Sequence, residues 1–64
     1  MSRETIWDNM NRPIGEIETK YDGNQVLWDS MNNPLGEYRK KTDDTWDNMN
    51  RRIGNGNQLL RLLK

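Results

Sequence analysis

The chain contains no cysteine and no histidine, so two common ways of stabilising a small protein are excluded. Disulfides need cysteine, and structural zinc sites need thiolate or imidazole ligands. Phenylalanine is also absent, and only 31% of the 64 residues are hydrophobic. A single domain with so few apolar residues often completes its burial by associating with further chains. We therefore predict a homo-oligomer or a complex with a protein partner, with no metal and no cofactor.

Long apolar stretches are missing as well. A membrane-spanning helix needs about 20 consecutive apolar residues, and no stretch of this chain approaches that length. The first residues, Met1–Thr5, are not followed by an apolar segment like that of a signal peptide. The sequence thus predicts a cytoplasmic protein without a membrane partner.

The side chains that most enzymes use for catalysis are scarce. Without histidine or cysteine, the two serines, Ser2 and Ser30, have no base to activate them. No glycine-rich phosphate loop is present, and the acidic residues Asp43, Asp44 and Asp47 are too sparse for a calcium loop. We predict that the protein is not an enzyme and has no catalytic, cofactor-binding or metal-binding residues.

One nine-residue motif, however, occurs three times. The motif is Trp-Asp-x-Met-Asn-x-x-(Ile/Leu)-Gly, and its copies begin at Trp7, Trp28 and Trp46. Such a repeat indicates that one small structural unit is built several times.

Each copy has the pattern of a β-hairpin. Residues that favour strands precede the motif, as in Gln25–Trp28. The motif aspartate can accept a hydrogen bond from the backbone two residues on, and the asparagine after methionine suits the left-handed position of a three-residue loop. Pro13 and Pro34 then suit the start of a return strand. The residues with these turn and strand roles are Asp8, Asn11, Gly15, Asp29, Asn32, Gly36, Asp47, Asn50 and Gly54.

A three-residue loop also predicts the register of each hairpin. The predicted pairs are Asp8–Arg12, Trp7–Pro13 and Ile6–Ile14, then Asp29–Asn33, Trp28–Pro34 and Leu27–Leu35, then Asp47–Arg51, Trp46–Arg52 and Thr45–Ile53. This register places an indole against a proline ring twice and against a guanidinium once. A four-residue loop would shift the pairing by one. The motif glycines then lie inside strands, where we expect a neighbouring tryptophan to cover the bare backbone.

The predicted fold is all-β, with three tandem β-hairpin repeats around a pseudo-symmetry axis and a short C-terminal helix. Within a single domain over 1–64, the repeats span about 3–20, 24–41 and 44–56, and a Leu-rich tail spans 57–64. Asn57 can cap a helix that runs through Lys64. So short a helix is not stable alone and must dock by its leucines. A closing strand is the alternative for the tail.

The pattern of a strand followed by Asp-x-x-Asn-x-Pro-Ile-Gly, reused along the chain and closed by a Leu-rich tail, resembles the small bacterial β-hairpin-repeat proteins called β-flower proteins. The resemblance covers the chain from Ile6 to Leu63. It implies a fold and no activity. β-Flower proteins look four-fold, whereas three full copies are visible here, so either the tail fills the fourth place or the symmetry is three-fold.

The charge of the chain is zero overall but segregated. Residues 1–37 hold seven acids and three bases, a net charge of −4, and residues 38–64 hold three acids and seven bases, a net charge of +4. Such a chain can pair head to tail with a copy of itself, or present a basic face to an anionic partner. A solvated mixed surface is the plain alternative.

The repeated large side chains are the candidate binding residues, together with two arginines. They are Trp7, Trp28, Trp46, Met10, Met31, Met49, Arg51 and Arg52. The tryptophans either fill the centre of the protein or a subunit interface, or form exposed platforms for sugars, bases or a peptide. The methionines at the turn tips are either solvent-exposed filler or an adaptable apolar contact patch.

From these residues we predict a non-enzymatic protein–protein interaction module that self-associates and acts by occupying a partner surface, as a phage or bacterial accessory or inhibitor protein does. Its contacts would come from the turn tips and from Leu59–Leu63. One alternative is a multivalent carbohydrate-binding lectin that uses the repeated tryptophans with motif Asp and Asn side chains. Another is single-stranded nucleic-acid binding through the basic half, including Arg39–Lys41, although the neutral chain disfavours it.

Overall fold

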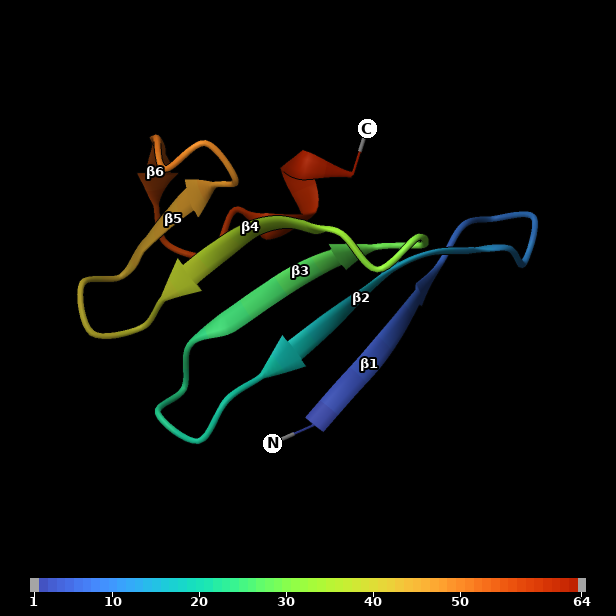
Figure 1. The fold of residues 1–64 in the computed structure, drawn as a ribbon, viewed down its shortest axis with the longest axis horizontal. Helices are drawn as coiled ribbons and strands as arrows, with labels where there is room; N and C mark the ends of the chain where they lie inside the picture. Colours follow the sequence, from blue (N-terminus) through green and yellow to red (C-terminus); the bar gives the residue numbers. More distant parts are fainter. Residues whose placement is uncertain (1, 64) are drawn as a thin grey trace.

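Residues 2–63 are described by the computed structural model, and they form six β-strands and one turn of 3₁₀-helix (Figure 1). The strands are β1 (Ser2–Trp7), β2 (Pro13–Thr19), β3 (Gln25–Asp29), β4 (Pro34–Arg39), β5 (Asp44–Asp47) and β6 (Arg52–Asn55), and the turn is η1 (Leu59–Leu62). All six strands join one antiparallel sheet in the order of the sequence. The all-β prediction is therefore confirmed, and the sheet is open with β1 and β6 at its edges.

The three motif turns share one backbone geometry. In the first turn, the Asn11 N–H donates to the Asp8 carbonyl oxygen at 3.1 Å, and Oδ1 of Asp8 accepts the N–H groups of Met10 and Arg12 at 2.9 Å each. The same hydrogen bonds recur in the other two turns. The left-handed conformation predicted for the asparagine is present in all three, with φ of 63° at Asn11, 66° at Asn32 and 65° at Asn50.

These turns depend on ionised aspartates. The backbone N–H of Arg12 lowers the pKa of Asp8 below its usual range, and the N–H of Met10 adds to the effect. The backbone N–H of the residue four positions on lowers the pKa of Asp29 and of Asp47 in the same way. An N–H donor stabilises the carboxylate more than the protonated acid. The ionised form of its own aspartate thus stabilises each turn.

The register prediction is correct beside the turns and wrong one step further. Trp7 faces Pro13, and the equivalent pairs recur in the other hairpins. Each return strand then carries a β-bulge, which places one extra residue opposite its partner. The pairs Ile6–Gly15, Leu27–Gly36 and Thr45–Gly54 therefore replace the predicted Ile6–Ile14, Leu27–Leu35 and Thr45–Ile53. The bulge moves a glycine to the place where the next hairpin approaches.

That approach is close at two of the three glycines. A Cβ atom on Gly15 would lie 2.7 Å from the carbonyl oxygen of Trp28, and one on Gly36 would lie 2.6 Å from that of Trp46. The prediction that a tryptophan covers the glycine is thus corrected in one respect, because the covering group is its backbone carbonyl. Leucines of the tail lie over the same two glycines. At Gly54 the nearest atom outside its chain neighbours, among residues 2–63, is Cγ of Gln58 at 3.5 Å.

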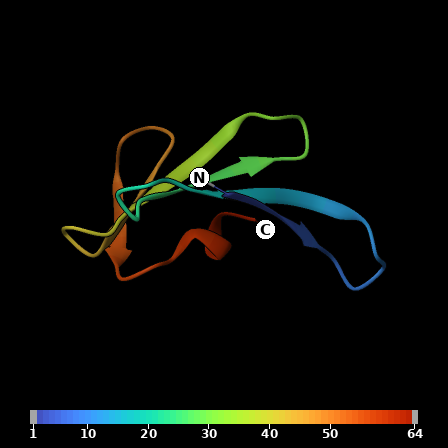
Figure 2. The ribbon, with the colours of Figure 1, turned by 90° about the horizontal axis from the view of Figure 1, so that it is seen from below.

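The tail runs across one face of the sheet (Figure 2). The predicted helix is a single 3₁₀ turn, because so few residues cannot sustain an α-helix. Lys64, its predicted end, lies outside the described residues. The Leu59 N–H donates to Oδ1 of Asn57 at 3.2 Å where the turn begins. Leu59 is fully buried against the sheet, so the tail docks by a leucine as predicted.

The two faces of the sheet differ in what covers them. Leu27 is fully buried beneath the tail, and its neighbours Val26 and Trp28 point to the opposite face because side chains alternate along a strand. Trp46 lies on that opposite face as well, next to the buried Thr45. We call this uncovered side the indole face. No helix within residues 2–63 has the length and apolar composition to cross a membrane.

Candidate interaction surface

Trp28 packs on the hairpin that precedes it. The guanidinium of Arg3, from β1, lies 4.8 Å from the centre of the indole ring. The indole Nε1 donates a hydrogen bond to Oε1 of Glu18, from β2, at 3.2 Å. Arg3 also forms an ion pair with Glu16 at 2.9 Å, which helps to hold the guanidinium at the ring. Trp28 belongs to the second hairpin by sequence but completes the surface of the first.

Trp46 also lies against an arginine of the preceding hairpin, here from the adjacent strand. The guanidinium of Arg39, from β4, lies 4.6 Å from the centre of its ring. Arg39 forms an ion pair with Glu37 on the same strand at 3.4 Å. A guanidinium over an aromatic face is a favourable cation–π arrangement. Each of these two indoles is thus placed by an arginine of the preceding hairpin.

The carboxylate of Asp44 holds the other side of Trp46. It accepts hydrogen bonds from the Thr42 hydroxyl at 2.6 Å and from Nε1 of Trp46 at 3.0 Å, and it pairs with Arg52 at 3.4 Å. The Thr42 hydroxyl, followed by Trp46 and Arg52, lowers the pKa of Asp44 below its usual range. Asp44 is therefore ionised at neutral pH and keeps the indole in one orientation.

Trp7 differs from the other two tryptophans. Its side chain is 55% exposed, whereas Trp28 and Trp46 are half-buried. It lies on β1, at the edge of the sheet, so no hairpin precedes it within residues 2–63. The buried hydrophobic side chains of the described chain are Leu27 and Leu59. The prediction that tryptophans fill the centre is therefore wrong for this chain, and a role at a subunit interface stays a prediction.

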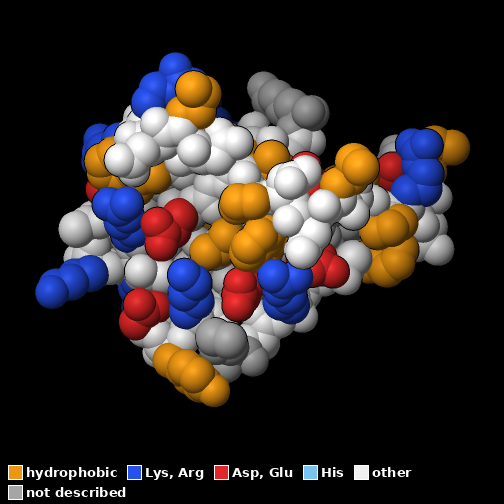
Figure 3. Space-filling model, viewed as in Figure 1, with side chains coloured by type: hydrophobic (Ala, Val, Ile, Leu, Met, Phe, Trp, Pro, Cys, Tyr) orange, Lys and Arg blue, Asp and Glu red, His pale blue; other side chains and the backbone are white. Residues whose placement is uncertain are grey.

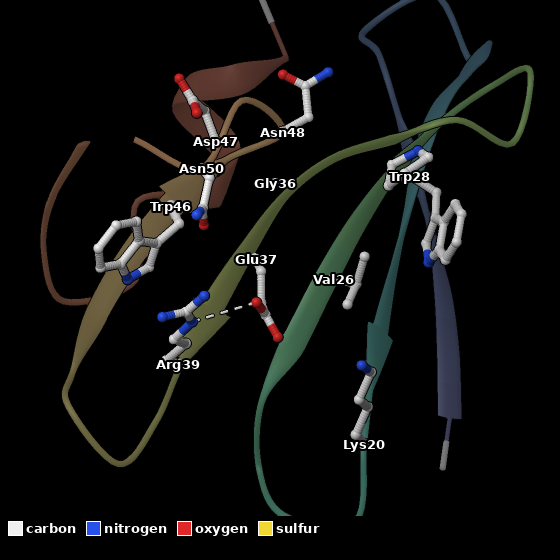
Figure 4. Close-up of a pocket in the computed structure, with 11 residues that line it drawn as sticks. Lys20, Val26, Trp28, Gly36, Glu37, Arg39, Trp46, Asp47, Asn48 and Asn50 are labelled. Carbon is white, nitrogen blue, oxygen red and sulfur yellow. Dashed lines mark hydrogen bonds and ion pairs between the residues drawn. The ribbon is translucent and has the colours of Figure 1, made fainter. Parts of the chain in front are cut away.

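A groove of about 370 Å³ lies between Trp28 and Trp46 on the indole face (Figure 4). Its walls are the two indoles, and the Glu37–Arg39 ion pair and Val26 lie between them. Apolar side chains gather in the middle of this face, bordered by acidic and basic groups (Figure 3). The groove offers apolar contact and stacking on indole rings, with charged groups at its border.

No family model, no curated protein and no solved structure matches this chain. The resemblance to β-flower proteins therefore stays a prediction, and the surface has to be interpreted from its own side chains. Within residues 2–63, no three acidic side chains gather closely enough to hold a metal ion. In the same part of the chain, every buried side-chain nitrogen or oxygen has a hydrogen-bond partner.

The methionines of the motif are at the turn tips. Met10 and Met49 are each 69% exposed, and Met31 is 80% exposed. A meander reverses direction at every turn, so the turns after β1, β3 and β5 lie at one end of the sheet. The twist of the sheet spreads these turns apart (Figure 1). The methionines therefore form separate apolar points at one end of the sheet.

The two candidate arginines are engaged inside their own hairpin. Arg51 pairs with Asp47 at 3.1 Å, and Arg52 pairs with Asp44 at 3.4 Å. Exposed ion pairs contribute only about 0–1 kcal/mol, so a partner could displace them at small cost. Arg51 thus contacts the aspartate of its turn, and Arg52 contacts the carboxylate that holds Trp46.

Sequence reasoning missed Arg3, Glu18 and Glu37 as parts of this surface, and it named Arg39 only as a candidate nucleic-acid contact. A signal for them was present, because residues two apart on a strand point to the same face. Placing them beside the indoles, however, requires the register between hairpins. That register follows the bulge and could not be read from one repeat alone.

Proposed function

We propose that this protein is a non-enzymatic protein–protein interaction module that self-associates. The observation that carries the proposal is the small buried core, Leu27 and Leu59, beside large apolar side chains that stay exposed. The exposed ones are Trp7, Met10, Tyr21, Met31, Met49 and Leu60. Covering apolar surface gains about 25 cal/mol per Å², so a second protein surface would stabilise this one.

Self-association would also account for the predicted pseudo-symmetry axis. One chain forms an open sheet with two edges. An edge strand is a ready template for pairing with another chain unless short length or charge protects it. If copies join through these edges, the axis predicted from the repeat belongs to the assembly.

The turn tips are the proposed contact points with a further protein. Methionine is flexible and polarisable, which suits it to irregular apolar surfaces. The ionised aspartate beneath each tip fixes the turn, so the methionine is presented from a rigid base. Of the tail, Leu60 is exposed at 61% and available for contact, whereas Leu59 is buried within the chain. The module would act in the cytoplasm by occupying a surface of its partner.

The test of self-association is sedimentation velocity of the purified protein over a wide concentration range. The proposal expects the sedimentation coefficient to rise from that of a monomer to that of an oligomer as the protein is concentrated. A monomer at every concentration would contradict it.

Carbohydrate binding is the second candidate, and the groove between Trp28 and Trp46 is the observation that favours it. Sugars stack on indole faces, and two indoles facing one groove suit a short glycan. The motif aspartates, however, already accept backbone hydrogen bonds in the turns. Titration with a glycan panel would shift tryptophan emission in the wild type and in Trp7→Phe, but less in Trp46→Phe. An unchanged spectrum with every glycan would end this candidate.

Single-stranded nucleic-acid binding gains no support from the described contacts. Arg39, Arg51 and Arg52 each have a carboxylate partner, and Glu37 lies in the groove beside Trp46. A phosphate backbone would have to displace these carboxylates and would be repelled by them.

A further inference from the structure

We infer that a second copy of this chain adds its β1 strand to the open edge of β6 and forms there the same junction that joins successive hairpins within the chain. This inference rests on the proposed self-association and names its surface. The partner is a second copy, bound head to tail.

The junction exists twice within one chain, with one geometry. Where β3 follows β2, Gly15 faces Asp29 and Glu16 faces Trp28. Where β5 follows β4, the equivalent pairs are Gly36–Asp47 and Glu37–Trp46. At both places the tryptophan carbonyl approaches the glycine so closely that a Cβ atom would collide with it, at 2.7 Å and 2.6 Å. A glycine on one hairpin and a tryptophan on the next are thus the two halves of the junction.

One glycine half is left open at the end of the sheet. Gly54 on β6 has the same position after the bulge as Gly15 and Gly36. Those two are buried, whereas Gly54 is partly exposed, and within residues 2–63 no carbonyl oxygen lies within 4 Å of its Cβ position. Glycine weakens a strand unless another group must come close. Within residues 2–63, the group nearest to this position is the Gln58 side chain at 3.5 Å, and no backbone carbonyl approaches it.

One tryptophan half is left open at the start of the sheet. Trp7 is exposed because no hairpin precedes it within the described chain. The Asp8 N–H donates to the Arg12 carbonyl, toward β2. Backbone groups alternate in direction along an antiparallel strand, so the N–H and C=O of Trp7 point to the open edge. Trp7 therefore presents the carbonyl that Gly54 lacks.

The edge of β6 offers an outward N–H to receive it, while the Asn55 carbonyl on the same edge accepts a hydrogen bond from Nε2 of Gln58 at 3.0 Å, which a second copy would displace. The Gly56 N–H donates to the Asp43 carbonyl, back toward the first strand of its own hairpin. By the same alternation, the N–H of Asn55 points outward. The intrachain junctions predict the register Gly54 opposite Asp8 of the second copy, and Asn55 opposite its Trp7. Since β6 ends at Asn55, this junction is shorter than those within the chain. The shorter junction should bind more weakly, so the fraction of associated protein should rise with concentration.

Charge favours this head-to-tail arrangement over a pairing of like edges. Residues 1–37 carry a net charge of −4 and residues 38–64 carry +4, so a β6–β1 contact brings opposite halves together. Two β1 edges in contact would bring two acidic halves together. Complementary charge speeds association and disfavours wrong partners. A head-to-tail contact either closes into a ring or continues as a filament.

The test uses one variant for each half of the junction. Gly54→Ala adds a Cβ that fits the monomer, because its nearest neighbour, Cγ of Gln58, would lie at an ordinary contact distance of 3.5 Å and Gly54 is not among the residues with positive φ. In the junction that Cβ would collide with the carbonyl of Trp7. Trp7→Ala keeps the backbone carbonyl and leaves β6 intact, but it removes the indole, which at both intrachain junctions packs on the preceding hairpin. Circular dichroism and thermal melting verify that each variant is folded.

Sedimentation velocity then compares the wild type, each variant and their equimolar mixture. The expected result is an oligomer for the wild type, a monomer for each variant alone, and a heterodimer in the mixture, since one intact β6 then meets one intact β1. If Gly54→Ala assembles as the wild type does, the junction is wrong while self-association stands. If the wild type stays a monomer, the proposed function fails together with the inference. If Gly54→Ala does not fold, assembly by Trp7→Ala alone as in the wild type would overturn the inference, and its loss would support it.

Discussion

Trp28 and Trp7 occupy the same position of the motif, yet one is half-buried and the other is 55% exposed. The difference lies in the neighbouring hairpin and not in the motif. Trp28 has Arg3 and Glu18 of the preceding hairpin around its ring. Trp7 lies on the edge strand β1, and no hairpin precedes it within residues 2–63. The surroundings of a repeated residue are therefore set by the junction between repeats, and the ends of the sheet show what each half of that junction looks like alone.

The largest expected effect is a loss of stability on substituting a glycine that the next hairpin covers, compared with substituting the glycine that no hairpin covers. Gly36→Ala should lower the free energy of unfolding by about 3 kcal/mol, because its Cβ would collide with the carbonyl of Trp46 and with Leu62. Gly54→Ala should change it by less than about 1 kcal/mol under monomeric conditions. Urea denaturation of both variants at low concentration measures the difference. Equal losses would show that the glycine positions are equivalent within the chain.

A smaller effect is expected in the turns, which are alike in every repeat. Asn32→Ala should destabilise by about 1 kcal/mol, because alanine tolerates a φ of 66° less well than asparagine. Asn32→Gly should be neutral or stabilising, since glycine adopts this conformation without strain. Thermal melting of the two variants gives the comparison. If alanine and glycine are tolerated equally, the left-handed turn is not the feature that matters.

Acid should weaken the turns and the Trp46 junction together. The pKa values of Asp8, Asp29, Asp44 and Asp47 are lowered in the folded chain. The unfolded chain therefore binds more protons as the pH falls, so stability declines. The contribution is complete well above the unfolded value of about 3.9 and is lost as the pH falls through the lower folded values. Urea midpoints between neutral and strongly acidic pH measure this, and a flat profile would contradict the role of the carboxylates.

The smallest effect concerns the arginine at each covered indole. Arg39→Met keeps an apolar stem near Trp46 but removes the guanidinium, and a cation–π contact at a half-exposed site contributes about 0.5–1 kcal/mol. Arg12→Met, on the first turn, removes an exposed ion pair and serves as the matched control. Thermal melting should show a larger decrease for Arg39→Met. The same decrease in both variants would mean that the ring gains nothing from the guanidinium.

The sequence predicted local features and failed where repeats meet. The left-handed asparagines and the Trp7–Pro13 pair follow from chemistry within a few residues, so one repeat was enough to predict them. The bulge at Ile14 places Gly15 opposite Ile6. At that position the carbonyl of Trp28, from the next hairpin, comes so close that only a glycine fits. No pattern inside a single repeat contains that requirement.

The residues of the candidate surface were likewise predicted where they belong to the motif and not where they depend on contacts between repeats. The tryptophans and methionines were predicted as contact residues because the motif repeats them, and the structure places the methionines at exposed turn tips. The arginines at the indoles lie outside the motif and reach the rings through the sheet register, so Arg3 was missed and Arg39 was predicted only as a nucleic-acid contact. The predicted helix is one 3₁₀ turn because so few residues cannot sustain an α-helix, and its Leu59 is buried against the sheet.

The most direct test of the junction is the emission of Trp7 alone, measured in a chain carrying Trp28→Phe and Trp46→Phe as the protein is concentrated. If Trp7 of one copy packs on β6 of another, its emission should move to shorter wavelength over the same concentration range in which sedimentation detects assembly. In the same chain with Gly54→Ala, the emission should not move. If the chain assembles while Trp7 keeps the emission of a solvent-exposed indole, the open ends of the sheet are not two halves of one junction.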